Sequence, residues 1–252
     1  GGKIKINVKN SPIKRLSYLV GKNEPNFTAK SQILNLLTNN KNNLDDIKDA
    51  FNLEQVSEDF FEDYKNLFLE LSKEIERLIK LDPNIKEEFK NKNIKPDNFS
   101  KKLLGQIVFL YFLQKKGWLG VEKNENGNFK KWGSGSKTFL QDLFEKYKSK
   151  KIKVKNFFNN LLEPIFYDAL NNEEEYYEKL DCKIPFLNGG LFKPFHEYNW
   201  AETELNISDN LIEKIFSTFS RYNFTVQEDQ DFDADVAVDP EMLGKVFENL
   251  LP

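Results

Sequence analysis

The stretch "FSKKLLGQIVFLYFLQKKGWLG", residues 99–120, is the strongest indication of the fold. Between Leu103 and Leu113 the residues are apolar on nearly every side of a helix. A helix of this kind is stable only when all its faces are buried. Ser100 is a suitable N-cap, and Gly117 is suited to end the helix. The sequence therefore predicts one central, buried helix.

A long amphipathic helix is predicted before this stretch, over residues 58–80. Its apolar residues recur at helical spacing along one face. They are Phe60, Tyr64, Leu67, Leu71, Ile75 and Leu78. Ser57 is the expected N-cap, followed by Glu58 and Asp59 in the first turn, where the helix dipole favours negative charge.

The remaining segments are mostly helical in pattern as well. Helices are predicted over 28–37, 44–51, 138–147, 155–170, 208–219 and 239–251. "KIKINV" (3–8) instead alternates apolar and polar residues, and "KRLSYLV" (14–20) could pair with it across a turn. We therefore expect a mainly α fold, an irregular multi-helix domain with a short N-terminal β hairpin. Residues 1–52 form its strands and short helices, and residues 53–252 form the helical domain.

Composition excludes several classes of protein. Hydrophobic residues make up 39% of the 252 residues, which is typical of a packed globular protein. No apolar run reaches the roughly 18 residues of a membrane span, so no membrane association is expected. The single cysteine, Cys182, excludes an internal disulfide. The start at Gly1-Gly2 and the lone Met242 suggest a fragment of a longer protein.

Charge is distributed unevenly along the chain. Residues 86–160 contain 18 lysines and no arginine against 7 acidic residues, whereas residues 161–252 contain 6 basic and 20 acidic residues. Two interpretations stay open. The middle segment contacts a polyanion, or it is the solvated surface of a chain with 34 lysines and 3 arginines.

A glycine-containing loop, "VEKNENGNFKKWGSGSK" (121–137), carries the candidate DNA contacts. Lys130, Lys131 and Lys137 supply amines for phosphates, and Trp132 supplies a ring for stacking or packing. The alternative is a flexible, non-functional tip at "GSGSK" (133–137). Scarce arginine disfavours base-specific readout.

No residue is assigned a catalytic, cofactor-binding or metal-binding role. His196 is the single histidine, and Cys182 has no second ligand at zinc spacing. Asp239, Glu241 and Lys245 are residue types found in metal-dependent nucleases. Their positions instead fit an N-cap and an i,i+4 pair on the helix at 239–251.

Three segments near the C-terminal end carry a family resemblance. They are "IPFLNGGLFKPF" (184–195), "YNFTVQED" (222–229) and "DPEMLGKVFENLLP" (239–252). In this order and spacing they resemble the type IIG restriction–modification enzymes, which fuse a DNA nuclease with an adenine-specific DNA methyltransferase. The resemblance extends back through residues 103–120 and 51–68, and so covers most of the chain.

The resemblance implies that this chain is the helical region before the methyltransferase core. Residues 1–52 could be the tail of the nuclease domain. The family's methyl-donor loop and N-P-P-Y motif have no counterpart in this sequence, so no catalytic residue is carried over. The parent would use S-adenosylmethionine and a divalent metal (Mg) in a bacterial or archaeal cytoplasm. Its partners would be DNA and the nuclease and methyltransferase domains of the same chain.

Asn188, Gly189 and Gly190 are expected to form a structural turn between Leu187 and Phe192. The two glycines would allow a positive φ or a close backbone approach. A direct contact with DNA or the methyl donor is the alternative. For the whole chain, three functions stay open: a connector that contacts the DNA backbone, a purely structural interdomain docking module, and part of a phage-exclusion DNA methyltransferase without nuclease.

Overall fold

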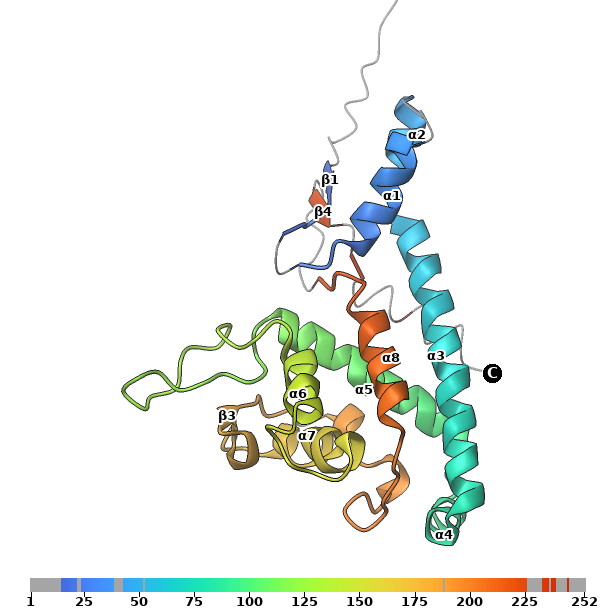
Figure 1. Cartoon of the computed structure of the whole chain (residues 1–252), viewed down its shortest axis with the longest axis vertical. Coiled ribbons are helices and arrows are strands. Elements are labelled where there is room, and N and C mark those ends of the chain that lie inside the picture. Colours follow the sequence, from blue (N-terminus) through green and yellow to red (C-terminus); the bar gives the residue numbers. More distant parts are fainter. Residues whose placement is uncertain are drawn as a thin grey trace, which may run out of the picture.

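The fold is mainly α, as predicted; α3, α6 and α8 lie beside α5, whereas α1 and α2 lie at one end of the molecule (Figure 1). The computed structural model describes residues 15–21, 24–38, 43–51, 53–187, 189–225, 233–235, 237–238 and 244. Its α-helices are α1 (Phe27–Thr38), α2 (Leu44–Asp49), α3 (Leu53–Leu81), α4 (Pro83–Asn91), α5 (Pro96–Lys115), α6 (Phe139–Lys148), α7 (Glu163–Tyr167) and α8 (Asp209–Phe219). Its strands are β1 (Arg15–Ser17), β2 (Tyr176–Tyr177), β3 (Cys182–Lys183) and β4 (Asp233–Asp235).

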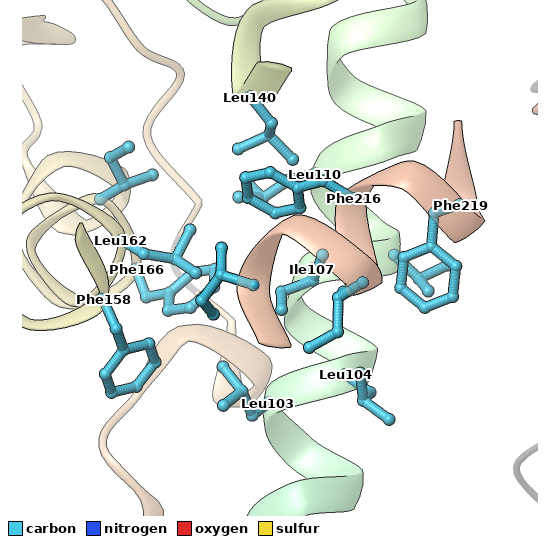
Figure 2. Packing of buried hydrophobic residues seen from close by; sticks show 14 of the residues in the cluster. Leu103, Leu104, Ile107, Leu110, Leu140, Phe158, Leu162, Phe166, Phe216 and Phe219 are labelled. Atoms are coloured by element: carbon cyan, nitrogen blue, oxygen red, sulfur yellow. The ribbon is translucent and has the colours of Figure 1, made fainter. Parts of the chain in front are cut away.

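Helix α5 is the buried helix that its apolar sequence predicts. Leu104, Ile107 and Leu110 are fully buried. Figure 2 shows these side chains packed toward α8, which contributes Phe216 and Phe219. Burial on several sides explains why α5 carries apolar residues all round.

The ends of α5 test the predicted start signal, Ser100, and the predicted stop signal, Gly117. Pro96 occupies the first turn, where a missing N–H does no harm. Ser100 therefore lies inside the helix, and its Oγ donates to the Pro96 carbonyl at 2.8 Å. The N-cap prediction for Ser100 was wrong. Gly117 adopts φ +67° directly after the helix, which confirms it as the stop.

Helix α3 buries the predicted face and is longer than predicted. The six apolar residues of the stripe are all buried. At about 1.5 Å per residue, its 29 residues span roughly 44 Å. Because the helix already starts at Leu53, Ser57 lies inside it and the N-cap prediction was wrong.

The N-terminal strand has a partner that sequence patterning did not reveal. β1 pairs in parallel with β4, with Leu16 opposite Ala234. The expected hairpin partner, residues 3–8, lies outside the described residues, so the hairpin and the division at residue 52 stay predictions. Asn43 caps the predicted helix α2 by accepting from the Asp46 N–H at 2.8 Å.

The predicted C-terminal helices are only partly described. Helices α6 and α8 match the predictions at 138–147 and 208–219. The predicted helix 155–170 is instead a π-helical turn, Phe158–Leu162, that continues into α7 and then a 3₁₀ turn, Ala169–Asn171. Except for Gly244, the helix predicted at 239–251 lies outside the described residues.

Candidate nucleic-acid interface

The loop 121–137 is fastened to the fold at its glycines. The Gly117 carbonyl accepts hydrogen bonds from the N–H groups of Gly133 (3.1 Å) and Gly135 (2.9 Å). A Cβ on Gly135 would lie 2.2 Å from the Leu119 carbonyl oxygen, so no larger residue fits there. These contacts hold Gly133 and Gly135 against the residue that ends α5, and the interpretation of residues 133–137 as a flexible tip stays a prediction. Figure 1 shows the loop as a projection that extends away from the helices.

The projecting part of this loop is held to the strand pair β2–β3. Lys123 and Phe129 form an isolated β-bridge across it. The Lys123 Nζ lies 2.6 Å from an Asp181 carboxylate oxygen. The same ammonium lies 5.0 Å from the centroid of the Tyr176 ring, within cation–π range. These contacts brace the loop against the residues around β2 and β3.

The four predicted DNA-contact side chains are all exposed, but they differ in their partners. Lys130 Nζ lies 3.8 Å from Glu122, and Lys137 Nζ lies 3.8 Å from Glu24. Lys131 has no ion-pair partner among the described residues. Trp132 is 37% exposed, and Lys183 Nζ lies 4.3 Å from its ring centroid. One face of the indole is therefore already covered by an ammonium group.

Lys137, unlike the other three, lines a cavity of about 570 Å³. Glu24 bridges Lys137 and Lys115 at this cavity, and Lys115 Nζ also donates to the Asn223 side chain at 2.9 Å. Gln141 donates from its amide to Tyr111 Oη at 2.6 Å. The cavity's polar groups are thus largely paired with one another. Sequence reasoning missed them, although Asn223 lies in a segment that carries the family resemblance.

The segment 190–193 is fixed to α5 by side-chain hydrogen bonds to its backbone. Lys102 Nζ donates to the carbonyls of Gly190 (3.2 Å) and Lys193 (2.6 Å). Gln106, fully buried, donates to the Leu191 carbonyl at 2.8 Å. Burial lowers the pKa of Lys102. Phe192 is buried and anchors the end of the segment.

The expected reason for the two glycines in this segment was wrong. Gly189 has extended backbone angles (φ −126°, ψ 150°), and Gly190 does not have a positive φ either. A Cβ on either glycine would meet no atom within 4 Å. Asn188 lies outside the described residues. The turn is instead fixed by Lys102 and Gln106, while its purely structural role stays a prediction.

Glu163, at the start of α7, is a buried carboxyl that no pattern in the sequence singles out. It is fully buried, and neither carboxyl oxygen forms a regular hydrogen bond with a described residue. Loss of solvation raises the pKa of Glu163 well above its ordinary value, and the Tyr198 hydroxyl offsets only part of this rise. Burial raises the pKa of both Tyr198 and Tyr167, and the neighbouring Glu163 carboxyl raises them further.

The residues considered for catalysis or metal binding are not assembled into a reactive group. His196 is exposed, and its Nδ1 lies 3.0 Å from the Lys92 carbonyl. Burial raises the pKa of the Cys182 thiol to about 12, which disfavours the reactive thiolate. In the described part of the chain, no three His, Cys, Asp or Glu side chains come together in a way that could hold a metal ion. Asp239, Glu241 and Lys245 lie outside it.

None of the described helices is long and apolar enough to span a membrane.

The helical fold and its braced, lysine-bearing loop can be compared with known proteins. No protein-family model and no solved structure matches the chain. The chain is similar to the "Putative type II restriction enzyme and methyltransferase" of Methanocaldococcus jannaschii, with 29% identity over 180 residues. The match covers 69% of this chain and 13% of that protein. It supports a restriction–modification family, in agreement with the resemblance of the sequence motifs.

Proposed function

We propose that this chain is a non-catalytic helical connector of a type II restriction–modification enzyme, and that it contacts the DNA backbone. The observation that supports this best is the similarity over 69% of the chain to a protein named as both restriction enzyme and methyltransferase. The chain spans only 13% of that protein, so the catalytic modules are assigned to other parts of the parent.

In this proposal the chain positions two modules of the parent. The methyltransferase transfers a methyl group from S-adenosylmethionine to an adenine amino group, and the nuclease cleaves DNA with Mg²⁺. The described residues form no metal-holding group, and we assign no step of either reaction to them.

The projecting loop supplies phosphate contacts. Lys130 and Lys131 are exposed on a braced loop, and Lys137 is exposed beside the cavity. Ammonium groups attract phosphates without reading the base sequence. DNA affinity from this loop is therefore expected to be insensitive to sequence and to fall with added salt.

The test is DNA binding by a charge-reversed loop. Lys130→Glu, Lys131→Glu and Lys137→Glu together are expected to weaken binding equally for duplexes of unrelated sequence. The matched control reverses three exposed lysines on α3, Lys65, Lys73 and Lys80, and should weaken binding less. Fluorescence anisotropy over a range of salt concentrations measures both. A loss confined to one DNA sequence would indicate base readout by this loop.

A purely structural docking module is the second candidate, and the acidic segment 161–252 favours it. In that case segment 86–160 is merely solvated. Wild-type chain that shows no salt-dependent DNA binding would support this candidate over ours.

A further inference from the structure

Six lysines crowd into ten residues after the middle of α6. The stretch "KYKSKKIKVK" (146–155) contains no acidic residue. We call its lysines the basic cluster: Lys146, Lys148, Lys150, Lys151, Lys153 and Lys155. All six are exposed. None of them was singled out as a site from the sequence.

Four members of the basic cluster line one hollow of about 540 Å³. They are Lys148, Lys150, Lys153 and Lys155. Asp209 also lines the hollow, but its carboxylate accepts from Tyr147 Oη at 2.7 Å and lies in the first turn of α8, where negative charge is favoured. The hollow therefore keeps an excess of positive charge.

The members of the cluster differ in how far their charge is neutralised. Lys155 Nζ lies 2.8 Å from Glu204, and Lys148 Nζ lies 3.5 Å from Glu213. Lys150, Lys151 and Lys153, by contrast, have no ion-pair partner in the part of the chain that the structure describes. These three ammonium groups are available to an external anion.

Lys150 has a left-handed backbone conformation, which glycine adopts more readily than lysine. Its φ is +59°. The Lys150 N–H donates to the Tyr147 carbonyl and the Lys151 N–H donates to the Lys146 carbonyl, each at 2.9 Å, and these two hydrogen bonds close the end of α6. Glycine or asparagine is the usual residue at such a position, because a Cβ is strained there. A Cβ at this position is strained, so helix termination does not explain a lysine here.

Helix capping explains only part of the cluster. Lys146 and Lys148 lie in the last turn of α6, where the helix dipole favours positive charge. That effect falls off within a turn and does not account for Lys151 and Lys153. The exposed large apolar side chains of the described residues all lie outside 146–155, so the cluster lacks the apolar anchors of a membrane-binding surface.

We propose that the basic cluster is a second binding surface for the phosphate backbone of double-stranded DNA, distinct from Lys130, Lys131 and Lys137. This inference rests on the proposed function, because it takes DNA as the polyanion that the chain meets. The surface holds the duplex without selecting its sequence, since it carries lysines and no arginine.

The test measures duplex binding by the whole chain at several salt concentrations. Lys150→Ser, Lys151→Ser and Lys153→Ser are changed together. Three lost phosphate contacts should reduce the slope of log K against log salt by about 2–3 and weaken binding at least tenfold near 0.1 M salt. The control Lys65→Ser, Lys73→Ser, Lys80→Ser removes the same charge from α3, outside segment 86–160, and should leave the slope nearly unchanged.

A single substitution separates binding from folding. Lys150→Gly relieves the positive-φ strain and should raise the melting temperature by about 2–4 °C. The same variant should weaken DNA binding and lower the salt slope by about 1. A merely structural lysine would not produce this combination.

The outcomes distinguish this inference from the proposed function. If the 150/151/153 variant binds DNA like wild type while a 130/131/137 variant is impaired, the second surface is wrong and the proposed function stands. If wild-type chain does not bind DNA at all, both fail. Equal losses in the cluster and control variants overturn the inference as well. Binding to phosphatidylserine vesicles that depends on the cluster, without an effect on DNA, would identify a membrane instead.

Discussion

Glu163 should make the stability of this protein fall as pH rises, and Glu163→Gln should remove that dependence. The carboxyl is fully buried, and burial raises its pKa well above the ordinary 4.5. In the unfolded chain it loses its proton above that ordinary value, whereas in the folded chain it keeps the proton to higher pH. The folded state then binds more protons, so increasing pH favours unfolding.

The size of the effect follows from proton linkage. One proton bound by the folded state alone lowers the free energy of unfolding by about 1.4 kcal/mol per pH unit. The loss begins near the ordinary pKa of glutamate and ends at the raised pKa of Glu163. Each pH unit inside this window therefore removes a noticeable part of the usual 5–15 kcal/mol that stabilises a folded domain.

Urea unfolding of wild type and Glu163→Gln at pH 5, 6, 7 and 8 measures this directly. The variant has nearly the same shape but cannot ionise, so its advantage in unfolding free energy should grow with pH and then level off. Glu76→Gln removes a carboxylate from the exposed surface of α3 and controls for net charge. A constant difference between wild type and Glu163→Gln from pH 5 to 8 would refute the reasoning. A variant that becomes relatively less stable as pH rises would show that the ionised carboxylate is stabilising.

Two further predictions concern glycines. Gly120→Ala should destabilise the fold by about 1 kcal/mol or more relative to Gly127→Ala. Both glycines have positive φ, but only at Gly120 would a Cβ meet the Phe139 ring, at 2.4 Å. Equal melting temperatures for the two variants would contradict this. Gly189→Ala and Gly190→Ala should each change stability by less than about 0.5 kcal/mol, because neither has positive φ and both have open space. Loss of 2 kcal/mol in urea unfolding at either position would mean that the glycine is required by the fold.

The helical architecture could be predicted from residue periodicity. Apolar residues all round α5 predicted its burial, and the stripe from Phe60 to Leu78 predicted the inner face of α3. Gly117 likewise marked the end of α5. These features could be predicted because helical periodicity and helix termination depend only on residues three or four positions apart in the sequence. Cap positions were less secure, since Pro96 and Leu53 start their helices earlier than the serines suggested.

Tertiary structure alone decided the contacts between distant segments. The pairing of β1 with β4, the packing of Gly135 against Leu119 and the hold of Lys102 on residues 190–193 all leave no periodic signal in the sequence. The same holds for the isolation of the Glu163 carboxyl and for the hollow lined by the basic cluster. Which lysines are neutralised and which stay available depends on acidic side chains far away in the chain, and only the folded arrangement brings those side chains within reach.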